Sequence, residues 1–472
     1  MEKNFDVIIV GGGPAGMFCA YELITRKPDA KILIIEQGKA IRERKCPAQA
    51  KGIPCVKCKV CSITHGSSGA GAFSDGKLLL PHPTDRRVRG NLGRHLDLAQ
   101  SMELYKYTDE VYLSFGATKE IKGEDGIGYV NTTLAPYLKQ AELRANCSRI
   151  RHLGTDGAHE VYKNIEDFLL KEKGVVTFFN TEVTDIIVDT GRVTGVKYRQ
   201  GKKIGEILSD KVVLAIGRSG TEWLEKLCKK HKIENYSGPA DLGIRYELPD
   251  SVMQDINRVL YEGKFIGTPN PYRDKVRTFC QNPSGLVSAE SYKGELTIVN
   301  GHSLLTPASE NTNLALLVSM DFGGLENPIE VTEQIARSLN KVGRGQPIVQ
   351  RLGDLRSNHR TTAEALRRNS VEPTLKTAVP GDLSLGMPMR VLVDILGFID
   401  QMEIIAPGFA DDDNLLYGPE IKFYSLMLRL SKDCKTSIQG LYGIGDGSGP
   451  THGLMPASVN GVLLGRILAS RI

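Results

Sequence analysis

Near the start of the chain, two continuous apolar runs flank a segment whose apolar residues recur at helical spacing. Residues 5–10 predict a buried strand, the apolar positions of 14–26 recur at helical spacing, and 31–35 predict a second strand. A strand, a helix and a second strand within about 30 residues are typical of a βαβ unit. The pattern therefore predicts a parallel sheet that contains both strands.

Periodicity disappears over residues 38–90, which are rich in Gly, Ser, Cys and Pro. A segment of this length is too long for an ordinary connection and indicates a functional loop region. Helical patterns return at 92–115 and 131–147. After a further helix near residue 160, four strands are expected at Val175–Phe179, Glu182–Val188, Val193–Tyr198 and Lys211–Ile216, as a sheet plus a three-stranded meander.

The chain has 472 residues, more than one hydrophobic core usually organises. Residues 441–471 return to a strand, a glycine-rich turn and an apolar helix, whereas 240–395 read as mixed α and β without a second phosphate-binding signature. We therefore expect an α/β fold in which one domain is interrupted by an inserted α+β domain. The expected segments are 1–238 and 395–472 for the first domain, with a Cys-rich loop at 45–62, and 239–394 for the inserted substrate or cap domain.

Charge and hydropathy narrow the class of protein. Lys and Arg number 60 against 55 Asp and Glu, and the charges are spread along the chain, so charge alone does not imply nucleic acid as a partner. The first residues run from Lys3 directly into an apolar strand, which leaves no room for a signal peptide. No apolar run approaches the roughly 18 residues that a membrane helix requires. These features predict a cytoplasmic protein that does not span a membrane.

A glycine-rich turn joins the first strand to the first helix. Gly11, Gly13 and Gly16 match the pattern G-x-G-x-x-G, with Pro14 and Ala15 opening the helix. In this context the first glycine permits a tight turn, the second lets the backbone approach a pyrophosphate, and the third allows close packing of helix on strand. The helix N-terminus would offer N–H groups to the anion. The alternative is a glycine turn that only packs two elements together.

Glu36 closes the second strand, twenty residues after Gly16. A carboxylate there can accept hydrogen bonds from both ribose hydroxyls, whereas a 2′-phosphate would meet like charge. The expected ligand therefore contains adenosine without that phosphate.

Further features favour FAD over NAD. The segment Val212–Gly217 is an apolar strand that ends in a turn of small residues, with Ala215 and Gly217. It resembles the ATG-type motif of the glutathione-reductase superfamily. The segment 440–447 resembles the second FAD motif of that superfamily, in which the aspartate, here Asp446 after Gly445, binds the ribityl chain. The resemblance implies a glutathione-reductase-type FAD-binding Rossmann domain in which Val183 offers backbone to the adenine. Each motif alone is also compatible with ordinary packing of a strand on a turn.

Nearly the whole chain resembles the bacterial FAD-dependent dehydrogenase family. The matching segments are Cys46-Pro47, the three cysteines at 55, 58 and 61, Gly69–Lys77, Asp241–Arg245 and Val299–Ser303. Phe279–Pro283 and Glu420–Lys422 depart from the family pattern, which leaves the substrate open. The resemblance implies that Gly69, Ala70, Gly71 and Ala72 line the isoalloxazine, and a glycine-rich surface loop is the alternative.

Four cysteines lie within sixteen residues at the spacing C-x8-C-x2-C-x2-C. They are Cys46, Cys55, Cys58 and Cys61, in a loop that also contains lysines. Short C-x2-C spacings are common in [4Fe–4S] sites, where a distant cysteine completes the ligand set. A zinc site made of four cysteines, which usually has two separated pairs, and free or redox-active thiols are the alternatives.

Because no second nucleotide fold is evident, electrons are expected from a ferredoxin-like donor through the cysteine cluster, or from NAD(P)H bound transiently at the flavin. The leading hypothesis is an FAD-dependent oxidoreductase that transfers a hydride between flavin N5 and a small organic substrate. His452, His302 and Arg245 are the candidate catalytic residues, since a histidine can move a proton and an arginine can anchor a carboxylate. The alternatives are a flavin monooxygenase, a flavin-dependent tRNA-modifying enzyme and a non-catalytic flavin-binding protein.

Overall fold

The computed structural model describes residues 4–47, 58–74, 76–81, 96–236, 240–292, 296–302, 306–319, 328–423 and 426–472. The chain forms two compact units. The first comprises Met1–Glu120, Arg151–Gly238 and Ser425–Ile472, and the second comprises Ile121–Ile150 and Pro239–Tyr424. The second unit thus contains two segments, 121–150 and 395–424, that the sequence placed in the FAD-binding domain. Both have strands that pair within the second unit: β4 (Arg144–Asn146) with β13 (Lys264–Gly267), and β20 (Leu415–Phe423) with β12 (Ala240–Pro249).

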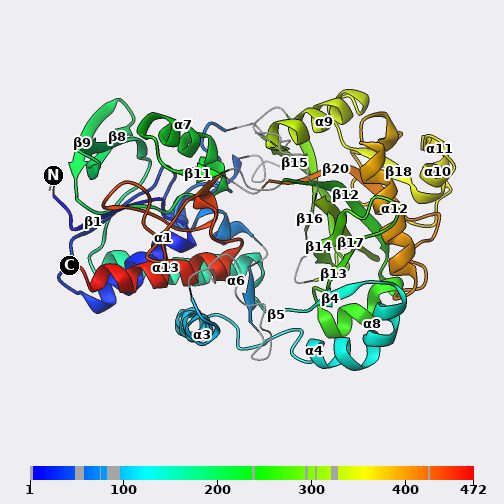
Figure 1. Ribbon diagram of the computed structural model, residues 1–472, viewed down its shortest axis with the longest axis horizontal. Coiled ribbons are helices and arrows are strands. Elements are labelled where there is room, and N and C mark those ends of the chain that lie inside the picture. Colours follow the sequence, from blue (N-terminus) through cyan, green and yellow to red (C-terminus); the bar gives the residue numbers. More distant parts are fainter. Residues whose placement is uncertain are drawn as a thin grey trace. The chain divides into compact units, whose positions relative to one another are not determined.

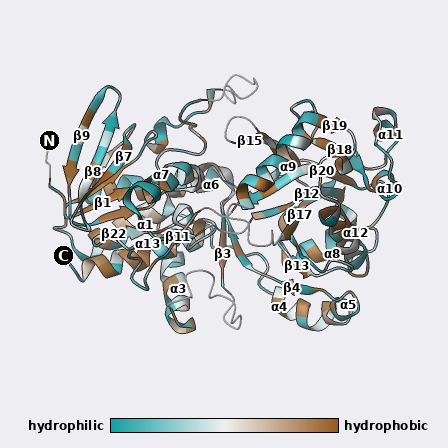
Figure 2. Ribbon diagram, turned by 45° about the horizontal axis from the view of Figure 1, so that its top comes forward, coloured by the Kyte–Doolittle hydropathy of each residue, from teal (hydrophilic) through white to brown (hydrophobic). Residues whose placement is uncertain are grey.

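A five-stranded parallel sheet forms the centre of the first unit (Figure 1). Its strands lie in the order β22 (Leu441–Gly443), β10 (Val212–Leu214), β1 (Val7–Val10), β2 (Ile32–Ile35) and β6 (Val176–Phe178). Four of these strands are buried along their whole length, as expected for a parallel sheet covered on both faces. Figure 2 shows apolar residues gathered along the central strands of this unit.

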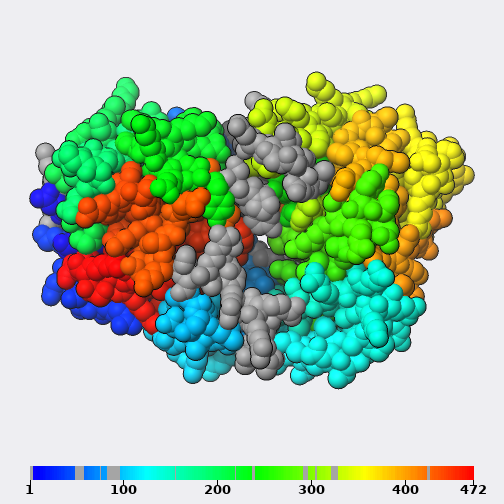
Figure 3. Space-filling view, viewed as in Figure 1, coloured from blue at the N-terminus to red at the C-terminus, as the bar shows by residue number. Residues whose placement is uncertain are grey.

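Helix α1 (Pro14–Arg26) packs along helix α13 (Leu454–Ala469), so segments from opposite ends of the sequence lie side by side (Figure 3). Glycines on α13 permit this close approach. A Cβ atom at Gly461 would lie 2.3 Å from the carbonyl oxygen of Ala15, and one at Gly465 would lie 2.9 Å from that of Cys19. The helix that follows the last strand is therefore held directly on the helix that follows the first.

The remaining elements of the first unit surround this sheet. The predicted meander is confirmed as β7 (Glu182–Asp189), β8 (Arg192–Gln200) and β9 (Lys203–Leu208), paired antiparallel. The third of these strands was not placed by the sequence, because only one of its six residues is buried. The other elements are α3 (Leu98–Ser114), α6 (Gly154–Asp167), α7 (Thr221–His231), the pair β3 (Lys77–Leu80) and β5 (Arg149–His152), and the pair β11 (Asn235–Tyr236) and β21 (Met427–Leu428).

An eight-stranded sheet, antiparallel except for one pair, organises the second unit. Its order is β19 (Val379–Pro380), β18 (Ile348–Arg351), β20, β12, β17 (Asn311–Ser319), β14 (Lys275–Asn282), β13 and β4. Helices α8 (Asp250–Leu260), α9 (Pro328–Val342) and α12 (Met389–Glu403) contribute to the main hydrophobic core on one face of the sheet. The hairpin of β15 (Leu286–Tyr292) and β16 (Leu296–His302) completes the unit. The molecule is thus mixed α/β, as the sequence predicts.

One expected helix, 131–147, is wrong in its second half. The chain forms α4 (Gly126–Tyr129), a π-helical turn η4 (Val130–Leu134) and α5 (Ala135–Gln140), and then strand β4. Glu142 adopts φ of +54°, which ends the helix before the strand begins. Among the described residues, no helix is long and apolar enough to cross a membrane.

A buried carboxyl group on α12 gives the second unit a pH-dependent stability. Asp394 is fully buried, and burial together with the neighbouring carboxylate of Asp274 raises its pKa to about 7. Asp274 itself accepts a hydrogen bond of 2.8 Å from Arg390 Nη2. Since an unfolded aspartate titrates near 3.8, the native chain holds a proton between about pH 4 and pH 7 that the unfolded chain has lost. The free energy of unfolding therefore falls as pH rises through this window.

Asp394→Asn lacks this titration. We therefore expect the difference in free energy of unfolding between variant and wild type to shift by about 2 kcal/mol in favour of the variant when the pH is raised from about 5 to about 8. Chemical denaturation at the two pH values measures this difference. Asp255→Asn is the matched control, because Asp255 is exposed on α8 and its side chain is 85% accessible. A stability difference between Asp394→Asn and wild type that is the same at both pH values would contradict the assignment.

Candidate functional site

The first glycine turn can be built only from glycine at two of its positions. Gly11 has φ of +106°, and a Cβ atom there would lie 2.6 Å from the carbonyl oxygen of Ala215. A Cβ atom at Gly16 would lie 2.1 Å from the carbonyl oxygen of Gly11. These close approaches bring β1, the start of α1 and the end of β10 together at one edge of the sheet.

The N-terminus of α1 faces open space. Its N-cap, Gly13, has an extended backbone, and no side chain caps the helix. Because Pro14 has no N–H, the N–H groups of Ala15 and Gly16 remain as the first donors of the helix. A Cβ atom at Gly13 would have only the Cα of Gly69 within 4 Å, at 4.0 Å. This end of the helix can therefore accept an anionic group, as the helix dipole favours.

Glu36, at the end of β2, organises the backbone around the turn. Its buried carboxylate accepts hydrogen bonds from the N–H groups of Gly12 at 2.8 Å, Gly38 at 2.8 Å and Gly66 at 2.9 Å. An ionised carboxylate has about four acceptor positions. Three of them are used by the backbone, so this geometry leaves about one for a ligand hydroxyl.

The glycine-rich segment predicted to line the isoalloxazine lies against the first turn. The Ser68 N–H donates to the carbonyl oxygen of Gly12 at 2.7 Å. The turn η2 (Gly69–Phe73), which includes Ala70 and Ala72, follows directly. A Cβ atom at Gly71 would lie 3.0 Å from Leu454 Cδ2, at the start of α13. The segment therefore lies between the first glycine turn and the N-terminus of α13.

A buried arginine that the sequence did not single out holds this segment in place. Arg44 Nε donates to the carbonyl oxygen of Ser62 at 2.9 Å, Nη2 to that of Ile63 at 2.7 Å, and Nη1 to that of Ser67 at 2.6 Å. Its guanidinium also lies 4.5 Å from the centre of the Phe73 ring. Burial lowers the pKa of Arg44 to about 10, so it is still charged at neutral pH. One basic residue among several in a segment without periodicity carries no signal that could have identified it.

Replacing Arg44 with methionine should weaken FAD binding, although the chain should still fold. The variant leaves three carbonyl oxygens without their charged donor, so we expect a loss of stability of about 2 to 3 kcal/mol. The glycine-rich segment would also lose its fixed position beside the first turn. Thermal unfolding without cofactor and a titration with FAD separate the two effects. An FAD affinity equal to that of wild type would show that the arginine has no positioning role.

The C-terminal glycine motif meets the N-terminal one. A Cβ atom at Gly445 would lie 3.0 Å from the Cβ of Ala15, and the Gly445 N–H donates to Asn460 Oδ1 at 3.0 Å. Asp446 accepts hydrogen bonds from Thr451 Oγ1 at 2.7 Å and from the Gly453 N–H at 3.0 Å. The aspartate therefore lies at the turn that leads into α13, and the two glycine motifs are in contact.

Open space in front of three glycines marks where a ligand could lie. Added Cβ atoms at Gly217 and at Gly453 would meet no atom within 4 Å, and one at Gly13 would meet only the Cα of Gly69. The Gly447 N–H donates to the carbonyl oxygen of Ile216 at 3.0 Å, which joins the end of β10 to the C-terminal motif. The first turn, the glycine-rich segment and the C-terminal motif thus converge within the first unit.

The predicted adenine contact lies beside Glu36 in the structure. The Thr181 N–H donates to the Glu36 carbonyl oxygen at 3.0 Å, and β7 begins one residue later. The side chain of Val183 is buried in the hydrophobic core, and Val183 pairs with Tyr198 of β8. Val183 thus lies two residues after a residue that is hydrogen-bonded to Glu36, and its contact with adenine stays a prediction.

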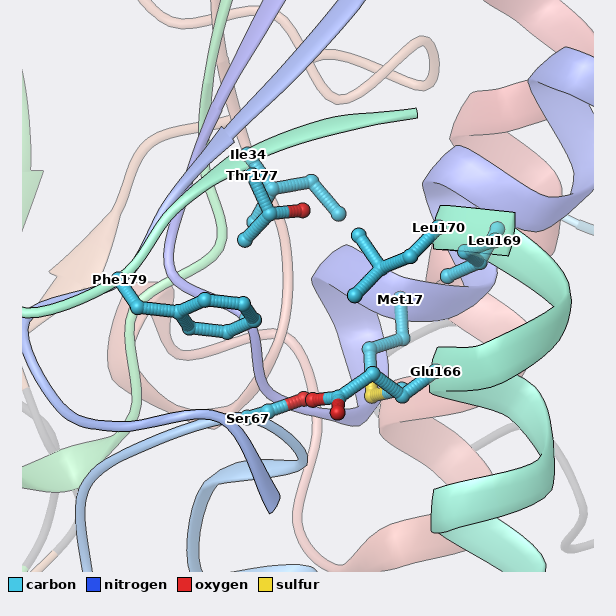
Figure 4. Close-up of a pocket in the computed structure, with 9 residues that line it drawn as sticks. Met17, Ile34, Ser67, Glu166, Leu169, Leu170, Thr177 and Phe179 are labelled. Atoms are coloured by element: carbon cyan, nitrogen blue, oxygen red, sulfur yellow. The ribbon is translucent and has the colours of Figure 1, made fainter. Parts of the chain in front are cut away.

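A small apolar pocket lies next to the first turn (Figure 4). Figure 4 shows Ser67 and Glu166 facing each other at one end, with apolar side chains around them. Burial raises the pKa of the Glu166 carboxyl group, which accepts a hydrogen bond from the Ile41 N–H at 3.1 Å. Sequence reasoning missed this residue, because a single acidic position inside an amphipathic helix resembles a solvated one. The pocket is lined by Gly12, Met17, Ile34, Ser67, Glu166, Leu169, Leu170, Thr177 and Phe179.

The predicted metal site is only partly described. Cys46, Cys58 and Cys61 are free thiols, and Cys55 lies outside the described residues. Within the described ranges, no group of three His, Cys, Asp or Glu side chains is arranged to hold a metal ion. The cysteine cluster stays a prediction.

The three candidate catalytic residues have different environments. His452 is exposed one residue before the N-cap of α13, and His302 is exposed at the end of β16 in the second unit. Arg245 is fully buried on β12, where Nε and Nη2 bind the two carboxylate oxygens of Glu420 at 2.9 and 2.8 Å. Its fork is thus already paired with a protein carboxylate.

Comparison with known proteins identifies two family matches. Residues 254–422 match the family described as FAD-dependent protein, C-terminal domain-like, and residues 2–42 match the Thi4 family. The first match covers most of the second unit, and the second covers β1, the glycine turn, α1 and β2.

Individual proteins also resemble this chain. An uncharacterized protein of Clostridium beijerinckii is 26% identical over 480 residues, covering 96% of this chain and 79% of the relative. Thiamine thiazole synthase of Coprinopsis cinerea is 60% identical over 35 residues, covering 7% of this chain and 11% of that protein. The open conformation of a flavocytochrome c3 fumarate reductase covers 99% of this chain and 78% of its own, with 12% identity and a TM-score of 0.46, too low to bear on function. Together, the family matches support an FAD-dependent oxidoreductase.

Proposed function

We propose that this chain binds one FAD across the three converging segments of the first unit and transfers a hydride between flavin N5 and a small organic substrate. The convergence of the two glycine motifs, in contact through Ala15 and Gly445, carries the proposal. A stretched dinucleotide requires an anion site, a ribose acceptor and a second polar anchor along one groove. The N-terminus of α1, Glu36 and Asp446 would supply them in that order.

Each residue has a defined task in this arrangement. The N–H groups of Ala15 and Gly16 would bind the pyrophosphate, and the remaining acceptor position of Glu36 would bind a ribose hydroxyl. Asp446 would hold the ribityl chain, with Thr451 and the Gly453 N–H fixing the orientation of its carboxylate. Ala215 and Gly217 would border the groove at the end of β10, in the glutathione-reductase-type arrangement that the motifs resemble.

The ring of the flavin would lie against the backbone of Gly69–Ala72. When bound, FAD supplies the two-electron chemistry at N5, and the chain supplies orientation, hydrogen bonds and a dry surface. His452, exposed beside the start of α13, is the candidate group to move a proton to or from the substrate. His302 belongs to the second unit, as does Arg245, whose guanidinium is already paired with Glu420 and therefore serves to position neighbouring strands.

The source of the electrons is a separate part of the proposal. Cys46, Cys55, Cys58 and Cys61 would ligate a [4Fe–4S] cluster that relays electrons from a ferredoxin-like donor, with NAD(P)H as the alternative donor. Anaerobic purification followed by iron and zinc analysis tests this part. About four iron atoms per chain would support the cluster, whereas flavin without iron would exclude the relay.

Anaerobic reduction tests the proposed activity. The protein loaded with FAD should bleach in its visible flavin bands with a chemical reductant, and the reduced flavin should then be reoxidised by an organic acceptor. A His452→Asn variant should keep its flavin spectrum and slow this reoxidation by about 100-fold if the histidine moves the proton. A flavin that no reductant bleaches would contradict an oxidoreductase.

A further inference from the structure

On the eight-stranded sheet of the second unit, the face opposite α8 and α12 contains residues that have no role in the proposed FAD site. Alternate residues of β12 divide between the two faces: Ile244 and Tyr246 belong to the core with these helices, whereas Arg245 does not. On β14, Val276 belongs to that core, and Phe279 does not. This second face therefore carries Arg245 from β12 and Phe279 from β14, beside a separate apolar cluster that includes Leu415 and Tyr417 of β20.

Arg245 fixes these segments to one another. Besides its paired hydrogen bonds to Glu420 on β20, its Nη1 donates to the Cys280 carbonyl oxygen at 2.9 Å, and its Nη2 donates to Asn300 Oδ1 at 3.0 Å. Both members of the ion pair are buried, with at most 1% of either side chain exposed. The arginine is therefore a positioning residue for β14, β16 and β20.

Three cations meet at one aromatic ring on this face. Arg277 Cζ lies 4.9 Å from the centre of the Phe279 ring, Lys422 Nζ lies 5.0 Å from it, and Lys264 Nζ lies 5.5 Å from it. All four side chains are half-buried and come from β13, β14 and β20. We call these four residues the Phe279 cluster.

The positive charge of this cluster is only partly compensated. Arg277 pairs with Asp241 at 2.6 Å, whereas neither lysine forms an ion pair within the described part of the chain. Two further carboxylates are close to this face, but Glu420 is bound by Arg245, and Glu290 accepts a hydrogen bond from Asn300 at 2.9 Å. Two half-buried ammonium groups, each within 5.5 Å of the same ring centre, are unfavourable unless an anion balances their charge.

The backbone beside the ring is also unusual. Strand β14 loses its register with β17 between Phe279 and Asn282, and Cys280 adopts φ of +45°. A bulge of this kind redirects the side chains next to it and is common near binding sites. The irregularity thus falls at the residue around which the cations gather.

We propose that the Phe279 cluster binds the carboxylate or phosphate group of a small organic anion, which is the substrate of this enzyme. Lys264 and Lys422 would share the anionic group, and the Arg277–Asp241 pair would hold Phe279 beside them. The assignment of this anion as substrate rests on the proposed function, whereas its binding does not. The segments Phe279–Pro283 and Glu420–Lys422, where the chain departs from the related family, would then adapt the site to its own substrate.

Binding of two simple anions tests the proposal. The full-length protein, loaded with FAD, is titrated with succinate and separately with inorganic phosphate at constant ionic strength, and binding is followed by calorimetry. We expect saturable binding of at least one probe, and the tighter probe identifies the anionic group. In the double variant Lys264→Met, Lys422→Met, that affinity should fall about tenfold or more, because both uncompensated charges are removed.

Matched variants separate this effect from a general loss of charge. Lys341→Met removes an exposed lysine on α9 and should leave binding unchanged, and Lys422→Arg should retain most of it. If the double variant fails to fold, Lys422→Met alone should still weaken binding several-fold. Absence of binding in the wild type, or equal binding in the double variant, would overturn the proposal. The flavin spectrum of the same samples reports separately on FAD, so a colourless protein that binds the anion contradicts only the proposed function.

Discussion

A Gly13→Ala variant should fold normally and lose its flavin. The added methyl group has only one atom within 4 Å, and the extended backbone of Gly13 suits any residue, so the chain itself has no reason to rearrange. As an N-cap, alanine in place of glycine costs about 1 kcal/mol or less. The methyl group would instead fill the space proposed for the pyrophosphate, and we expect FAD affinity to fall about 10- to 100-fold.

Two further glycine variants make this result specific. Gly128→Ala adds a methyl group that meets no atom within 4 Å but lies in the second unit, and it should leave FAD affinity unchanged. Gly16→Ala would place its methyl group 2.1 Å from a backbone oxygen and should destabilise the protein itself. Apoprotein unfolding and an FAD titration distinguish the three outcomes. Normal flavin binding by Gly13→Ala would show that the groove does not hold the pyrophosphate at this helix.

A Glu36→Ala variant should lose both stability and flavin. Three buried backbone N–H groups, at Gly12, Gly38 and Gly66, would lose their shared charged acceptor. Leaving such donors unsatisfied costs about 1 to 3 kcal/mol each, and partial access of water to the emptied space reduces the total, so we expect about 3 kcal/mol. Denaturant unfolding of the apoprotein measures this loss without interference from ligand binding.

A conservative variant and a surface control test whether the Glu36 carboxylate itself provides this stability. Glu36→Gln retains one oxygen acceptor and should be intermediate in stability. Glu206→Ala removes an exposed glutamate from β9 in the same unit, where its side chain is 57% accessible, and should change stability by less than about 0.5 kcal/mol. A Glu36→Ala protein as stable as wild type would contradict the network around this residue.

The parts of the fold that could be predicted are those in which local pattern and packing agree. Helix α1 has the predicted bounds Pro14–Arg26, because the glycine turn, the proline and the apolar period all fall at its start. Glycines at 11 and 16 were assigned their packing roles from spacing alone, and the added-Cβ distances agree with those roles. Contact between the motifs around Ala15 and Gly445 follows from the parallel strands that precede them.

The parts that could not be predicted depend on contacts between distant segments. The association of 121–150 with the second unit depends on pairing of β4 with β13, which no local pattern contains. Arg44 and Glu166 act through backbone groups far from them in sequence, so residue type and spacing give no indication of their roles. Arg245 was expected to offer a free guanidinium, and the acceptor that occupies it, Glu420, lies 175 residues away.

An equilibrium titration of the apoprotein with FAD and with FMN tests the central claim most directly. Flavin fluorescence reports the number of sites and the affinity of each ligand. If, as proposed, α1 binds the pyrophosphate and Glu36 binds a ribose, we predict one FAD per chain and at least about 100-fold weaker binding of FMN, which lacks the adenosine half. A protein that binds no flavin, or that binds FMN as tightly as FAD, would contradict the convergence of the two glycine motifs on a single dinucleotide.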